Sequence, residues 1–131
     1  MPKGLLRKAF FISDCMHSTF VKSFFWLCAA GLTVASLVPI DLLPPQSFNV
    51  WDKAQHALGF GWLAFFGLLS YPQRPTFVAG YLLVHGAAIE LAQAATGWRY
   101  GEWSDLAADG VGILLGTLAW WILRRGLRPA S

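Results

Sequence analysis

The chain consists of long apolar runs separated by short polar stretches. Residues 23–40 carry no formal charge, and in residues 54–73 the only side chain that titrates near neutral pH is that of His56. Each run is long enough to cross the hydrocarbon core of a bilayer, because a helix rises about 1.5 Å per residue. Two later runs, residues 75–89 and 110–123, are shorter, and each reaches that length only by including an acidic residue.

The backbone favours extending the two short runs into full helices. A segment that stopped halfway through lipid would leave N–H and C=O groups without partners, whereas a complete helix satisfies them internally. Prolines after the first run and the short connections at 70–75 and 97–104 separate the segments. The sequence therefore predicts an all-α polytopic membrane protein with four transmembrane helices in an antiparallel bundle, at roughly 22–40, 54–71, 76–97 and 105–123.

The charges predict the orientation of this bundle. In the four-helix topology, only Lys53 and Arg99 fall on one side, and the other eight cations fall on the opposite side: Lys3, Arg7, Lys8, Lys22, Arg74, Arg124, Arg125 and Arg128. Because cytoplasmic loops are enriched in Lys and Arg, both termini are expected in the cytoplasm. Residues 1–21 are then a cytoplasmic or interfacial N-terminal segment lying on the inner surface, residues 22–123 the transmembrane domain and residues 124–131 a basic cytoplasmic tail.

Composition agrees with a membrane protein. The 131 residues leave room for one domain; 56% are hydrophobic and 13% charged, where soluble domains are near a quarter charged. The net charge of +3 could suit nucleic acid, but such a protein would have to hide too much apolar surface. The expected partner is the lipid bilayer, not nucleic acid. Cys15 and Cys28 are too few for a disulfide scaffold, so no bridge is expected.

Polar residues gather at the predicted outer ends of the second, third and fourth helices. Asp52 and His56 are four residues apart and share a helix face, as do Glu90 and Gln93, three apart. On the fourth helix, Gly112 and Gly116 continue the face of two aspartates, and such small residues let helices approach closely in lipid. A lone carboxylate in lipid costs about 2.5–3.5 kcal/mol on insertion scales, so these faces should turn inward together. The predicted result is an outward-facing polar pocket with eight ligand-binding residues: Asp52, Lys53, His56, Glu90, Gln93, Arg99, Asp105 and Asp109.

These residues, in this order and spacing, resemble the VanZ-like family, which is named for a teicoplanin-resistance protein. The matching pieces are Asp52-Lys53-x-x-His56, Glu90-x-x-Gln93, Arg99, Asp105 and Gly112, and the resemblance covers about residues 22–123. It implies a multi-pass protein of the bacterial plasma (inner) membrane, linked in some members to lower susceptibility to lipoglycopeptides. It does not supply a reaction. One departure is Asp109, where members more usually carry Asn, which adds an acid to the site.

Three functions are compatible with the polar residues. The first is a cell-envelope protein that binds or modifies a surface lipid or glycan and lowers glycopeptide access. The second is a membrane enzyme acting on a lipid-linked headgroup, for which no catalytic residue is assigned and Glu90, Asp105 and His56 are the acid/base candidates. The third is a proton or cation pathway. It is ranked lower because the polar groups stop near the outer half of the membrane, and only His85 lies deeper.

A structural role is an equal alternative, in which ion pairs and hydrogen bonds lock the three helices together. Arg99 could clamp an anionic headgroup or form a salt bridge to Glu90 or Asp105, and Lys53 could reach the membrane surface. Glu102 and Asp41 are expected to be solvated loop charges. His85 is expected to be a packed or hydrogen-bonded helix histidine.

The candidate residues predict neither a metal nor a cofactor. One histidine with several carboxylates and no tight spacing motif is poor support for a metal site. Five acids against two cations at the outer end leave a formal charge of −3, which would repel a bare phosphate and favours cationic, hydroxyl-rich or glycan-like groups. The sequence indicates no oligomeric state.

Overall fold

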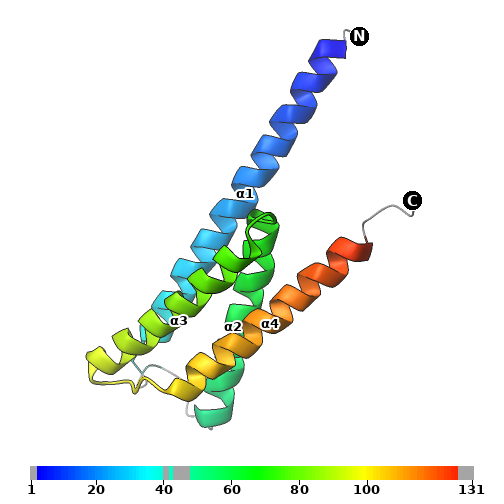
Figure 1. Cartoon of the computed structure of the whole chain (residues 1–131). Helices are drawn as coiled ribbons and strands as arrows, with labels where there is room; N and C mark the ends of the chain where they lie inside the picture. The colour runs from blue at the N-terminus through cyan, green and yellow to red at the C-terminus, as the bar shows by residue number, and fades with distance from the viewer. Residues whose placement is uncertain (1–2, 40–41, 43–47, 127–131) are drawn as a thin grey trace.

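A computed structural model describes the backbone of residues 3–39, 42 and 48–126, and the side chains of residues 18–39, 42 and 51–126. Its elements are the helices α1 (Lys3–Leu37), α2 (Phe48–Ser70), α3 (Pro75–Thr96) and α4 (Trp103–Gly126). Successive helices run in opposite directions, so the start of α1 and the end of α4 lie at the same end of the bundle (Figure 1). The all-α class and the four predicted helices are confirmed for the described residues.

In the described part of the chain, three segments are long and apolar enough to cross a membrane: residues Ser18–Leu37 of α1, α3 and α4. The two short apolar runs, 75–89 and 110–123, both belong to such helices. Most of the run at 54–73, up to Ser70, belongs to α2, which is not among the three. The polar residues Lys53, Gln55 and His56 near its start lower the hydropathy of α2.

The predicted start of the first helix, near residue 22, is wrong. The helix begins at Lys3 and continues without interruption to Leu37. No proline lies between Pro2 and Pro39, so nothing in the sequence forces a break. At about 1.5 Å per residue, α1 is roughly 52 Å long, and its first half projects beyond the other helices (Figure 1).

Several predictions concern residues outside the described part of the chain. The side chains of residues 1–17, predicted to lie on the inner surface, are outside it, and so is Cys15, for which no bridge is expected. Asp41, predicted to be solvated, and the basic tail after Gly126 are outside it too. Cys28, which is described, is a free, half-buried thiol.

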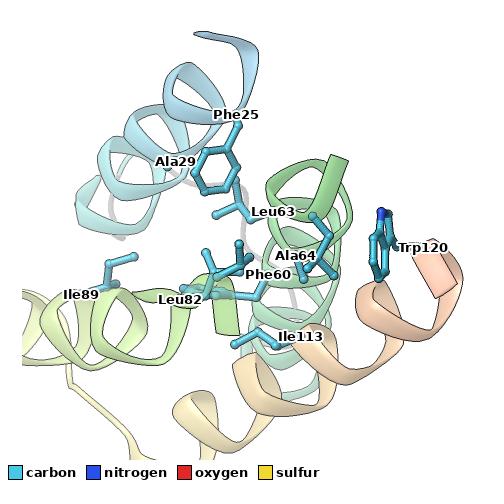
Figure 2. Close-up of a cluster of buried hydrophobic side chains, with 11 residues drawn as sticks. Phe25, Ala29, Phe60, Leu63, Ala64, Leu82, Ile89, Ile113 and Trp120 are labelled. Atoms are coloured by element: carbon cyan, nitrogen blue, oxygen red, sulfur yellow. The ribbon is translucent and has the colours of Figure 1, made fainter. Parts of the chain in front are cut away.

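The helices pack around α2, which contacts α1, α3 and α4. Figure 2 shows Phe25 and Ala29 of α1 on one side of α2 and Trp120 of α4 on another. The buried apolar cluster consists of Phe25, Ala29, Phe60, Leu63, Ala64, Leu68, Val78, Leu82, Ile89, Ile113 and Trp120.

The outer faces of all four helices are also apolar. Leu27, Leu58, Val84 and Leu114, on α1, α2, α3 and α4 respectively, are each at least 70% exposed. A soluble monomer rarely exposes apolar surface on this scale, whereas a surface that faces lipid must. This pattern, together with the three long apolar segments, is consistent with a membrane protein.

The closest approach in the bundle is between α2 and α4. A Cβ atom placed on Gly112 would overlap the carbonyl oxygen of Ala57, and one on Gly116 would overlap that of Gly61. Both glycines are buried. The predicted contact through Gly112 and Gly116 is therefore confirmed, and the backbones of the two helices touch there.

A matched pair of substitutions tests this contact. Gly116→Ala should lower the free energy of unfolding by roughly 1–3 kcal/mol, because the added methyl group forces α2 and α4 apart. Gly110→Ala on the same helix should leave stability unchanged or slightly raised, since a Cβ at Gly110 would meet no atom within 4 Å. Unfolding in mixed micelles, followed by circular dichroism, measures both. Equal effects of the two substitutions would contradict the contact.

Candidate functional site

The polar residues meet at the end of the bundle where α1 and α3 finish and α2 and α4 begin, here called the polar end (Figure 1). All eight residues of the predicted site lie there, together with Glu102. We call these nine residues the polar cluster: Asp52, Lys53, His56, Glu90, Gln93, Arg99, Glu102, Asp105 and Asp109.

The centre of the polar cluster is a contact between α2 and α4. His56 Nδ1 lies 2.8 Å from Asp109 Oδ1 and 3.9 Å from Glu90 Oε1 of α3. All three side chains are buried. Gly86 of α3 makes room for this arrangement, because a Cβ atom there would overlap Asp109 Oδ2.

A second group lies nearer the surface. Lys53 Nζ is 3.2 Å from Glu102 Oε2 and 3.3 Å from Asp105 Oδ1. Glu102 is an exposed loop charge, as predicted, and it also accepts hydrogen bonds from Lys53 and Ser104. The Glu102 backbone N–H also donates to Glu90 Oε2 at 2.7 Å. The loop before α4 is therefore fastened to both α2 and α3.

The end of α1 forms the third part of the polar end. Arg99 donates to the Ser36 carbonyl oxygen at 2.9 Å and to Asp52 Oδ1 at 3.1 Å. Gln93 donates to the same carbonyl, and Trp98 donates to that of Leu37. These bonds satisfy carbonyl groups that have no partner within α1. The predicted salt bridge from Arg99 to Glu90 or Asp105 is wrong; its partner is Asp52.

Four buried side-chain oxygens in the polar cluster accept no hydrogen bond: Glu90 Oε1, Gln93 Oε1, Asp105 Oδ1 and Asp109 Oδ2. Asp105 Oδ1 has the Lys53 ammonium nearby, though not in hydrogen-bonding geometry. Buried polar atoms without partners are rare and costly in folded proteins. These oxygens can accept hydrogen bonds from a ligand, or coordinate a cation.

Among the described side chains, two sets of residues could hold a metal ion by distance alone: His56 with Glu90 and Asp109, and His56 with Asp52 and Asp105. In each set the three ligand atoms lie within 4.8 Å of one another. The sets share His56. Chemically, the arrangement can also support proton transfer, since a carboxylate that holds an imidazole is a common acid/base unit.

His85 lies outside the polar cluster. Its Nε2 atom is 3.1 Å from Thr33 Oγ1 of α1, and its ring stacks on Tyr81. The prediction of a packed, hydrogen-bonded histidine is confirmed. At the opposite end of the bundle, the cations Lys22, Arg124 and Arg125 lie over the aromatic rings of Tyr71, Trp120 and Trp121.

Comparisons with protein-family models, with curated proteins and with solved structures find no match to this chain.

The two hydrogen bonds of Arg99 predict a loss on conservative substitution. Arg99→Lys should lower the free energy of unfolding by about 1 kcal/mol, because one ammonium group cannot reach both the Ser36 carbonyl and Asp52 as the guanidinium does. Arg125→Lys is the control; its exposed side chain lies over the Trp121 ring, and the change should stay within about 0.5 kcal/mol. If both variants unfold alike, Arg99 does not tie α1 to α2.

The contacts of Glu102 predict its titration. The hydrogen bond from Ser104, then the hydrogen bond and charge of Lys53, lower the pKa of the Glu102 carboxyl below its ordinary value. These contacts favour the ionised form, so any stability that they contribute is present at neutral pH and is lost as the pH falls through the lowered pKa. Ser104→Ala should raise the pKa of Glu102, as should Lys53→Met. Carbon-detected NMR of the labelled carboxyl measures it, and an unchanged pKa in both variants would refute the assignment.

Proposed function

We propose that the chain is a VanZ-like protein of the bacterial plasma membrane, with four spans and both termini in the cytoplasm. The charge distribution supports this orientation. Lys22, Arg74, Arg124 and Arg125 lie at the end opposite the polar cluster, and by the enrichment of cations in cytoplasmic loops that end faces the cytoplasm. The polar end then faces outward.

The position and length of α2 support its role as the fourth span. Its 23 residues are roughly 35 Å long, enough to cross the hydrocarbon core. It packs among three helices that qualify as spans and exposes Leu58 and Trp62 on its outer face. Its polar first turns are directed to the polar cluster, where His56 is buried and Lys53 is paired.

A direct test of the orientation uses reporter fusions at residues 46, 73 and 101. The topology predicts that these positions lie outside, inside and outside respectively. A fusion at residue 101 that reports a cytoplasmic location would overturn the orientation and, with it, an outward-facing polar cluster.

We propose that the polar cluster binds the headgroup of a cell-envelope lipid or glycan. The observation that carries this proposal is the set of buried oxygens without hydrogen-bond donors, from α3 and α4, at one end of the bundle. Hydroxyl or amine groups of a headgroup would supply the missing donors. The formal charge of −3 in the polar cluster, from five acids and two cations, favours a neutral or cationic group over a bare phosphate.

Binding or modifying such a component would lower the access of glycopeptides to the cell surface, as the VanZ-like resemblance implies. Expression in a susceptible strain should therefore lower its susceptibility to teicoplanin. Glu90→Gln should abolish the change, because it alters a buried carboxyl group at the centre of the cluster. His85→Gln, at a histidine outside the polar cluster, should retain it. Unchanged susceptibility with well-inserted protein would contradict the proposal.

A membrane enzyme acting on a lipid-linked headgroup is a second candidate. The observation that favours it is the 2.8 Å contact between the buried His56 and Asp109, with Glu90 beside them. Here His56 would move a proton, while Asp109 would orient its ring. Turnover of a polyprenyl-linked substrate by purified protein, lost in His56→Gln and retained in His85→Gln, would favour catalysis over binding alone.

A further inference from the structure

The centre of the polar cluster has the composition of a metal site. An imidazole nitrogen and two carboxylates, from His56, Glu90 and Asp109, converge from three different helices with ligand atoms within 4.8 Å of one another. Two ligands that each lie about 2.1 Å from one ion are roughly 3.0–3.4 Å apart, depending on the geometry. The distances from His56 Nδ1 to Asp109 Oδ1 and Glu90 Oε1, 2.8 and 3.9 Å, lie on either side of that spacing.

A second, independent observation points to a ligand at this position. Glu90 Oε1 and Asp109 Oδ2 have no hydrogen-bond donor, and their side chains are more than nine-tenths buried. The nearby cations are already paired, Arg99 with Asp52 and Lys53 with Glu102 and Asp105. Of the described ion pairs, those of Glu90 and Asp109 involve His56 alone.

We propose that His56, Glu90 and Asp109 bind one divalent transition-metal ion of the Zn²⁺ or Mn²⁺ class. With a neutral imidazole, the two carboxylates carry a charge of −2, which one divalent ion neutralises, and burial of the carboxylates then no longer opposes folding. A mixed nitrogen and oxygen ligand set suits these ions better than Mg²⁺ or Ca²⁺, which prefer oxygen ligands.

Three protein ligands leave coordination positions for water or for a substrate oxygen. Asp105, which lies within ligand distance of His56 in the second set, can supply a further oxygen. The bound ion changes the charge of the polar cluster from −3 to −1. A phosphate-bearing headgroup then becomes an acceptable ligand, because its oxygens can occupy the open positions on the ion.

The sequence predicted no metal, because the three ligands lie 34 and 19 residues apart, on separate helices, without a recognisable spacing motif. Only the packing of α2, α3 and α4 brings them together. The inference goes beyond the proposed function, since an ion can bind whether or not the polar cluster holds a lipid or glycan.

The test is binding of Mn²⁺ to the purified full-length chain in detergent micelles, followed by the loss of the free-ion electron paramagnetic resonance signal. Saturable binding of one ion per chain is expected, with competition by Zn²⁺. Asp109→Asn and Glu90→Gln keep the size of each side chain, and each should weaken binding by roughly 10- to 100-fold. The controls are His85→Gln, a histidine outside the polar cluster, and Arg125→Lys, at the opposite end of the bundle; both should bind nearly as the unchanged protein does.

A measurement on the unchanged protein keeps the proposal testable even if the variants do not fold. Electron spin-echo spectroscopy of the bound Mn²⁺ should show coupling to one histidine nitrogen. Absence of saturable binding, equal loss of affinity in the controls, or a bound ion without a nitrogen coupling would each overturn the site. None of these outcomes bears on teicoplanin susceptibility, so the two proposals fail separately.

Discussion

The whole polar end depends on how closely α2 and α4 approach each other. Backbone contact at Gly112 and Gly116 brings the first half of α4 against α2, and this places Asp109 beside His56. A larger residue at either glycine would separate the helices and expose a carboxylate to an apolar environment that cannot solvate it. The glycines and the acids on one face of α4 thus act together. The glycines set the distance between α2 and α4, and Asp109 contacts His56 only at that distance.

Around this contact, some ion pairs join the helices, whereas the carboxyl groups at the centre keep oxygens without hydrogen-bond donors. Arg99 joins the end of α1 to the start of α2, and Lys53 joins the start of α2 to the loop before α4. These pairs account for the locking role that the sequence offered as an alternative function. Among the described residues, the ion pairs of Glu90 and Asp109 involve His56, and one oxygen on each carboxyl group has no hydrogen-bond donor. Locking therefore explains the rim of the polar cluster but not its centre, which is why we assign binding to the centre.

The sequence predicted the elements and the membership of the site well because both follow from periodicity. Spacings of three and four residues put Glu90 with Gln93, and Asp105 with Asp109, on the buried faces that the structure shows. The predicted end of the third helix, residue 97, lies one residue past Thr96, where α3 ends. Gly97 follows in a left-handed conformation, with φ of 77°.

The partners of these residues were less predictable, because they depend on how three helices and two connections pack in space. Nothing in the spacing of Arg99 indicates that it reaches the Ser36 carbonyl, 63 residues earlier in the chain. The role of Glu102 was missed because its backbone N–H, rather than its side chain, contacts Glu90. The start of α1 was missed because charged residues were taken to end an apolar span, whereas they do not end a helix.

The distance between His56 and Asp109 in a lipid bilayer tests the central claim most directly. Solid-state NMR can measure the dipolar coupling between the labelled imidazole nitrogen of His56 and labelled aspartate carboxyl carbons, in a chain with His17 and His85 replaced by Gln. The structure predicts a strong coupling, from the 2.8 Å contact of Nδ1 with Asp109 Oδ1, that disappears in Asp109→Asn. If no such coupling is found, or if it survives that substitution, His56 and Asp109 do not form the centre of the polar cluster.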